Sequence, residues 1–274
     1  MNRRIFLIII TVTGLIVLPN FFGYPPASAA SHKKISKHLT EAFDPGLAKK
    51  LMTMDALVAY IDTSYKENRN AEAFLDYISA IVSSRFYHGY TYYSLSDNWV
   101  AALAGKLIWK DVSAIVIPDD ILRHNRAACS QQEIILMECV KHFGMDYRQV
   151  FFDHHFATEV KLGGKWHYVD VNQEVKAGGK SLADLINNGT LYSLYSNKVA
   201  TDEIQTMLGH PRYGKINSKT APRAKLFQEV TGCISRFFFP TLLCLQLFLL
   251  YRYDSKFRRL LSTQNAARVY CLNW

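Results

Sequence analysis

The chain is poor in cysteine, modest in charge and free of any repeated pattern, and each shortage excludes a class of protein. Its 274 residues contain only five cysteines, too few and too scattered for a small scaffold held together by disulfides. Charged residues make up 20% of the chain and hydrophobic residues 49%, a balance that excludes wholesale disorder. No segment recurs at a fixed period, which excludes solenoids and propellers. Length alone is compatible with one or two domains.

The positive charge of the chain is concentrated at its two ends. Of the formal net charge of +9, Arg3 and Arg4 contribute +2 and residues 252–274 contribute +4, which leaves only +3 for everything between them. A domain with so small an excess has no basic face of the kind that nucleic acid requires. We therefore expect no nucleic-acid partner.

Residues 1–29 have the layout of a secretory signal peptide. Two arginines precede an uncharged run from Ile5 to Leu18, and Ala27-Ser28-Ala29 provides the small residues of a cleavage site. Because Phe21 and Phe22 prolong the apolar character, an uncleaved N-terminal anchor is the alternative. Both interpretations predict an exported protein, periplasmic or on the extracellular face.

A second apolar segment, residues 234–251, lies near the other end. It is close to the ~20 residues that span a bilayer, and the single Arg236 inside it could extend its charged group to the membrane surface. The basic tail 252–274 follows at once, as cytoplasmic flanks do. We expect a C-terminal transmembrane anchor, with a buried core helix or an interfacial helix as alternatives.

The body between these ends, residues 31–232, is predicted to be one α+β domain with its core at 95–175. Its N-terminal part has helical periodicity, and a hairpin signal, Leu162-Gly163-Gly164, joins two later strands. The predicted helices are 45–65, 71–85, 97–109, 130–143, 182–186, 202–208 and 222–230, and the predicted strands are 115–117, 149–152, 155–161 and 165–171.

The hairpin turn fixes which side chains share a face of the sheet. If the turn centres on Gly163 and Gly164, Asp170 lies opposite Ala157, and strand alternation places His155 on the same face as both. His167 falls on the opposite face. This separation argues against a metal site built from the local histidines, so neither a metal nor another cofactor is expected.

Cys129 lies at the start of the predicted helix 130–143, whereas Cys139 occupies an apolar position within it. Backbone N–H groups and the helix dipole stabilise a thiolate at a helix start. A helix that begins with Cys129 and packs against a hairpin bearing His155 and Asp170 would supply a nucleophile, its base and the group that orients the base. Cys139 is expected to be a small core residue.

Four short segments together resemble the transglutaminase-like superfamily. The family pattern runs from a Cys at a helix start, through Gly-x-x-x-Arg entering a strand and His followed by Glu-Val, to Gly-x-Trp-x-x-x-Asp. The resemblance covers residues 128–172, and Asn98-Trp99 is a candidate extension upstream. The matching segments are Ala128-Cys129-Ser130-Gln131-Gln132, Gly144-Met145-Asp146-Tyr147-Arg148, His155-Phe156-Ala157-Thr158-Glu159-Val160 and Gly164-Lys165-Trp166 with Val169-Asp170.

The resemblance implies a papain-like core and acyl transfer through a triad of Cys129, His155 and Asp170. Family members include amide cross-linking enzymes, proteases and amidases, and some have lost catalysis. This chain departs from the family pattern at two short segments, and its 26-residue gap from Cys129 to His155 is on the short side, which implies a small active-site loop. Ala128 replaces the common Gly before the cysteine, and Phe156-Ala157 replaces the frequent Ala-Trp after the histidine.

Acyl transfer also needs hydrogen-bond donors for the oxyanion. The backbone N–H of Cys129 is one natural donor, and the second is expected from a side chain, with Asn98, Trp99 and Gln131 as the candidates. Trp166 is expected to pack, and Arg148 to form a structural ion pair rather than line the cleft.

The expected function is an exported, membrane-tethered thiol enzyme that acts on the amide or ester bonds of peptides or proteins of the cell envelope. Resolution of its acyl-enzyme by water would make it a peptidase or amidase, and resolution by an amine a cross-linking enzyme; the sequence leaves this choice open. A catalytically silent envelope binding module with the same fold is the alternative. A metal-dependent hydrolase is the second.

Overall fold

The computed structural model describes residues 9–13 and 43–271, with side chains to residue 252. It divides into two compact units. Over the described residues, the sheet unit comprises 43–93 and 101–229, and the long-helix unit comprises 9–13, 94–100 and 230–271. Apart from a short helical stretch at residues 9–13, the expected signal segment 1–29 lies outside the described residues.

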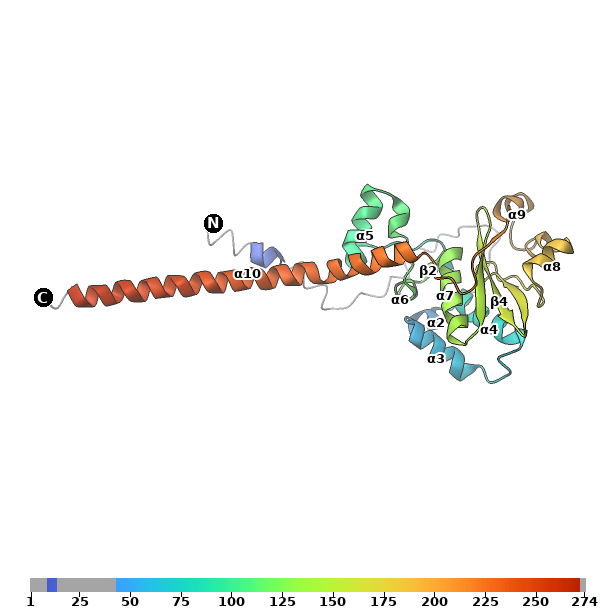
Figure 1. Cartoon of the computed structure of the whole chain (residues 1–274), viewed down its shortest axis with the longest axis horizontal. Coiled ribbons are helices and arrows are strands. Elements are labelled where there is room, and N and C mark those ends of the chain that lie inside the picture. The colour runs from blue at the N-terminus through green and yellow to red at the C-terminus, as the bar shows by residue number, and fades with distance from the viewer. Residues whose placement is uncertain (1–8, 14–42, 272–274) are drawn as a thin grey trace. The chain divides into compact units, whose positions relative to one another are not determined.

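The sheet unit is a mixture of helices and one antiparallel sheet (Figure 1). A separate parallel pair joins β1 to β2, and the main sheet has the strand order β5-β4-β3-β6. The strands are β1 Tyr87–His88, β2 Arg126–Ala127, β3 Asp146–Phe151, β4 Phe156–Leu162, β5 Lys165–Val169 and β6 Arg212–Tyr213. The helices are α2 Pro45–Lys50, α3 Met54–Ser64, α4 Glu72–Ser84, α5 Leu95–Leu107, η2 Lys110–Ser113, α6 Pro118–Leu122, α7 Cys129–His142, α8 Leu182–Asn187, η3 Tyr192–Leu194, α9 Thr201–Met207 and α10 Pro222–Cys271.

Helix α7 is the central element of the unit and packs against α3, α4 and the strands β3 and β4. One core contains its apolar side chains, together with those of α3 and α4 and with Val160 and Val169 of the sheet. A second core contains Ala157 and Tyr168 together with residues of α8 and α9. Since Ala157 and Val160 belong to different cores, strand alternation divides β4 between the two faces. The sheet therefore has α7 on one face and the later helices on the other (Figure 1).

The sequence predicts one helix over 45–65, but the structure has two, α2 and α3. α2 ends at Lys50, and α3 begins after Thr53, whose hydroxyl accepts the backbone N–H of Ala56. A threonine in this position satisfies one of the otherwise unpaired N–H groups of a helix start. The prediction missed this cap.

The predicted strand 115–117 is also wrong, because the segment is extended but pairs with no strand. Its Ile115 N–H donates to the Thr91 carbonyl beside an isolated bridge between Tyr92 and Ala114. Side-chain amides take two further backbone groups: Gln131 donates to the Ile115 carbonyl, and Gln228 accepts the Val116 N–H. The following residues, which were expected to close a strand, begin α6 at Pro118.

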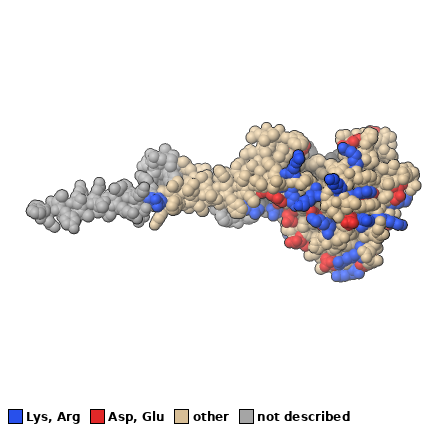
Figure 2. Space-filling view, in the orientation of Figure 1, with Lys and Arg blue, Asp and Glu red and all other residues tan. Residues whose placement is uncertain are grey.

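The predicted helix 222–230 continues without interruption through the expected anchor 234–251, so that α10 has 50 residues with Pro240 inside it. Its stretch Pro222–Arg252 is long and apolar enough to cross a membrane, because its most apolar 18-residue window has a mean hydropathy of 1.8 and only 11% of that window is buried. No charged side chain lies between Arg236 and Arg252. By contrast, charged groups of both signs cover the sheet unit (Figure 2).

Candidate active site

Cys129 is the first residue of α7 and is 9% exposed. The N–H groups of Gln131 and Gln132 both donate to the Ala128 carbonyl. The N–H groups of Cys129 and Ser130, at the first two positions of the helix, have no carbonyl within the helix to bond. Sulfur and backbone donors therefore share the positive end of the α7 dipole.

Gln131 does not serve as a donor beside Cys129, which corrects one of the three candidates for the oxyanion site. Its amide nitrogen donates to the carbonyls of Thr91 and Ile115, and its amide oxygen accepts the N–H groups of Thr91 and Ala128. These four bonds use both ends of the buried amide. Gln131 holds α7 against the segments around residues 91 and 115.

Asn98 and Trp99, the other two candidates, belong to the long-helix unit and are engaged there. The Asn98 amide donates to the Thr231 hydroxyl and accepts from that of Ser235, each at 2.9 Å. Trp99 packs against Phe238 and Phe239, with ring centroids 6.0 and 5.7 Å away. The donor and acceptor of the Asn98 amide are thus both engaged with side chains of α10.

The hairpin has the predicted register. Thr158 lies opposite Val169, and Val160 lies opposite His167, which is the pairing expected from a turn at Gly163-Gly164. Both glycines have positive φ, 58° and 80°, as a two-residue turn matching the strand twist requires. His155 lies immediately before β4 and Asp170 immediately after β5, so the hairpin brings them together as expected.

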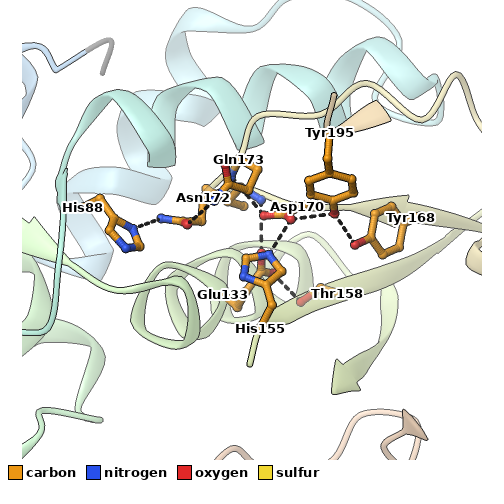
Figure 3. Close-up of polar contacts among 10 residues, drawn as sticks. His88, Glu133, His155, Thr158, Tyr168, Asp170, Asn172, Gln173 and Tyr195 are labelled. Carbon is orange, nitrogen blue, oxygen red and sulfur yellow. Dashed lines mark hydrogen bonds and ion pairs between the residues drawn. The ribbon is translucent and has the colours of Figure 1, made fainter. Parts of the chain in front are cut away.

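His155 and Asp170 form a buried pair in which His155 Nε2 lies 2.5 Å from Asp170 Oδ2 (Figure 3). The Cys129 side chain lies close enough to the same ring to contribute to its raised pKa. Burial by itself lowers the pKa of His155, but the charge and hydrogen bond of Asp170, followed by the interaction with Cys129, outweigh it and raise the pKa to about 10. The ring is therefore protonated at neutral pH, and the three residues form one linked group.

Asp170 has further donors that the sequence did not indicate. The Tyr195 hydroxyl donates to Asp170 Oδ2 at 2.7 Å, and the Gln173 N–H donates to Oδ1 at 3.0 Å. Tyr168 lies 2.5 Å from the Tyr195 hydroxyl (Figure 3). Burial, followed by the charge of Asp170, raises the pKa of both phenols well above its usual value. Both phenols therefore keep their protons. Because the Tyr195 hydroxyl already donates its hydrogen bond to Asp170, the Tyr168 hydroxyl is the donor in the bond between the two tyrosines.

Glu133, one helical turn beyond Cys129, is a second carboxyl group in this interior. The Thr158 hydroxyl donates to Oε2 at 2.5 Å and the Val171 N–H donates to Oε1 at 3.1 Å (Figure 3). Burial, followed by the negative charge of Asp170, raises its pKa well above the usual value. Its surroundings therefore favour the protonated form of Glu133 more than water does.

The segment after β1 brings polar side chains close to Cys129 and to the end of the hairpin. Tyr90 is half-exposed. Burial is the largest cause of its raised pKa; the interaction with Ser130 opposes the shift, and the nearby charge of Cys129 adds to it. His88 Nδ1 lies 2.6 Å from the amide nitrogen of Asn172 (Figure 3). The sequence analysis missed Tyr90, although a tyrosine in a loop carries no periodic signal that could identify it.

Arg148 forms the structural ion pair that was expected. Its guanidinium lies 2.5 Å from Glu159, which is fully buried, and it stacks between the rings of Trp166 and Tyr213 at 4.4 and 4.1 Å. The other Glu159 oxygen accepts the Leu182 N–H at 2.7 Å. This cluster therefore ties four strands, β3 to β6, to α8.

Over residues 9–13 and 43–252, no three His, Cys, Asp or Glu side chains are arranged to hold a metal ion. Val160, opposite His167 in the register, belongs to the core that contains α7, whereas His155 stacks beside Phe152 of the other core. The two histidines therefore lie on opposite sides of the sheet, as the sequence predicted.

No protein-family model, curated protein or solved structure matches the chain.

Proposed function

We propose that the protein is a thiol-dependent acyltransferase or hydrolase that acts on amide or ester bonds through an acyl-enzyme on Cys129. The observation that carries this proposal is one buried histidine ring that pairs with a buried acid, Asp170, and lies close to a cysteine at a helix start. This is the arrangement that a thiol nucleophile needs. It is also the arrangement expected from the resemblance to the transglutaminase-like superfamily and its papain-like core.

The mechanism begins with Cys129 and His155 as a thiolate and an imidazolium. The sulfur attacks the substrate carbonyl carbon, a C–S bond forms, and the carbonyl oxygen becomes an oxyanion. Collapse of this intermediate breaks the bond to the leaving amine or alcohol, which takes the proton from His155. Asp170 holds the ring in place and stabilises its charged form, as the acid of a Ser-His-Asp triad does.

The second half of the reaction uses the same groups in the opposite sense. The neutral His155 ring accepts a proton from water or from an amine as that acceptor attacks the thioester carbon. Collapse then expels the Cys129 thiolate and leaves His155 protonated again. Water gives hydrolysis and an amine gives cross-linking, so a substrate assay should offer both acceptors.

The backbone N–H of Cys129 is positioned to donate to the oxyanion. For the second donor, the contacts around Cys129 favour the Tyr90 hydroxyl over the three side chains named from the sequence. Tyr90 is close enough to Cys129 to sense its charge and is half-exposed, so that a substrate can reach it.

We also propose that α10 anchors the protein in a membrane, with the sheet unit exported. Phe237, Leu245 and Phe248 expose about half of their surface on a helix that is otherwise uncharged over this stretch. Basic residues follow the stretch and would remain on the cytoplasmic side. Substrates would then be peptides or proteins of the cell envelope.

The proposal is tested by the rate at which iodoacetamide alkylates Cys129 in the full-length chain, with peptide mass spectrometry to resolve each cysteine. We expect Cys129 to react at least ~10-fold faster than a model thiol near pH 6, because a free thiol ionises only near pH 8.5. His155→Ala should abolish this advantage. The exposed Cys233 is the internal reference and should not respond to the substitution.

A catalytically silent binding module predicts the opposite result. Cys129 would then react at the rate of the model thiol, and His155→Ala would leave that rate unchanged. In that case the pairing seen in the structure would have no chemical consequence, and the proposed function would be wrong.

A further inference from the structure

Glu133 is a buried carboxyl group for which the acyl-transfer mechanism has no use. It lies four residues after Cys129 on α7, and residues with this spacing lie on the same face of a helix. Only 2% of its surface is exposed. An acidic side chain in such a position requires partners that compensate for the loss of water.

The partners of Glu133 are the two ends of the hairpin that carry the rest of the site. Thr158, which donates to Oε2, is three residues beyond His155 on β4. Val171, whose N–H donates to Oε1, directly follows Asp170. One carboxyl group on the helix of the nucleophile therefore holds both the strand of the base and the residue next to the acid (Figure 3).

The charge state of Glu133 is compatible with this role. A second carboxylate beside Asp170 would compete with it for the charge of His155 and would repel it. Burial and the neighbouring Asp170 charge both favour the protonated form of Glu133. Asp170 thus pairs with the histidine, while Glu133 contributes hydrogen bonds to the strand and to the residue after Asp170.

We propose that Glu133 is a positioning residue, a clamp that holds α7 against the His155–Asp170 hairpin and thereby sets the distance between the Cys129 sulfur and the His155 ring. This inference rests on the proposed function, since it concerns the same three groups. Glu133 touches neither sulfur nor substrate, and it acts through the elements that carry them.

The experiment compares Glu133→Gln with Glu133→Met in the full-length protein, using the pH profile of Cys129 alkylation. Glutamine keeps an oxygen for the Val171 N–H and presents an amide that can donate to the Thr158 hydroxyl, so its profile should stay within ~3-fold of the wild type. Methionine has a similar length but makes neither bond. It should slow alkylation near pH 6 by about 10- to 100-fold, as a displacement of about 1 Å in an active site does.

Glu138 offers a matched control on the same helix, because its side chain is 37% exposed and pairs only with Lys141. Glu138→Gln should leave the alkylation profile unchanged. If Glu133→Met fails to fold, Thr158→Val removes one of the two bonds with little change in volume, and a several-fold loss of rate is expected. Circular dichroism of each variant establishes that its fold is kept.

Three results would overturn the inference. A Glu133→Gln profile as impaired as that of Glu133→Met would mean that the charge of Glu133 matters, and wild-type rates in a folded Glu133→Met and in Thr158→Val would mean that the clamp is unnecessary. Both leave the proposed function intact. By contrast, a wild-type Cys129 no more reactive than a model thiol would overturn the proposed function and this inference together.

Discussion

His155 lies between a thiol and an acid, and the acid is in turn held by a chain of two buried tyrosines. In this series of hydrogen bonds, the Tyr195 hydroxyl donates to Asp170 and the Tyr168 hydroxyl donates to Tyr195. Hydrogen bonds to a charged acceptor contribute about 1.5–3 kcal/mol. At the scale of single residues, the site therefore depends on how much negative charge these donors leave on Asp170 for the histidine.

Tyr195→Phe should change the chemistry of His155 without removing any group that reacts. Loss of the hydroxyl leaves more charge on Asp170 Oδ2, which should stabilise the imidazolium further and move the alkaline limb of the activity profile to higher pH. Tyr168→Phe, which removes a hydroxyl one step farther away, should leave that limb in place. The measurement is the rate of Cys129 acylation by a small activated ester as a function of pH. Equal shifts of the alkaline limb in both variants would contradict the proposed hydrogen-bond series from Tyr168 through Tyr195 to Asp170.

The raised pKa of His155 also predicts how stability depends on pH. Because the pKa is about 10 in the folded chain and about 6.5 when unfolded, the contribution of the pair is fully present below pH ~6.5 and is lost as the pH rises through ~10. His155→Gln should therefore cost most free energy of unfolding near pH 6, on the order of a few kcal/mol, and much less near pH 10. Urea unfolding at both values tests this, and a cost that is independent of pH would refute it.

At the scale of elements, the site is the meeting of one helix start with one hairpin. The turn at Gly163-Gly164 fixes the register, and a slip of one residue would move Asp170 to the other face of the sheet. α7 is held independently, by Gln131 at its first turn and by Glu133 one turn later. Geometry at the sulfur thus depends on side chains that never touch it.

The turn can be tested by substitution at Gly163, where φ is 58°. Gly163→Val should lower the free energy of unfolding by at least ~1 kcal/mol, because a β-branched residue is strained in the left-handed region. Gly163→Asn should cost much less, since Asn-Gly is a preferred sequence for this turn. Thermal unfolding of the two variants gives the comparison; equal losses would mean that the turn does not require this conformation.

The same elements explain what could be predicted from the sequence. Strand alternation and a two-glycine turn are local signals, and they were sufficient to place His155 and Asp170 side by side. The strand expected at 115–117 was wrong because its hydrogen-bond partners, Gln131 and Gln228, are distant in the sequence. For the same reason no pattern indicated that Tyr195, 25 residues from Asp170, would complete the site. Gln131 was misassigned because its position beside Cys129 says nothing about the backbone groups that its amide binds.

At the scale of the whole molecule, α10 combines an exposed apolar stretch with a basic flank. An arginine near the middle of a membrane span costs about 2.5–3.5 kcal/mol by insertion scales. We therefore expect the double substitution of Leu245 and Phe248 by Arg to release the protein from membranes during alkaline carbonate extraction. Leu226→Arg, at an exposed position near the start of the same helix, should remain in the membrane pellet. Retention of the double variant would show that α10 is not the anchor.

The central claim, that the Cys129 sulfur is ionised by its neighbour His155, is tested most directly by the ultraviolet absorbance of the thiolate. The difference between wild type and Cys129→Ser isolates the signal of this one sulfur. We predict that the thiolate signal is already present at about pH 6, well below the ~8.5 at which a free thiol ionises, and that His155→Ala removes it there. A signal that emerges only above about pH 8, and equally in the His155→Ala background, would contradict the account.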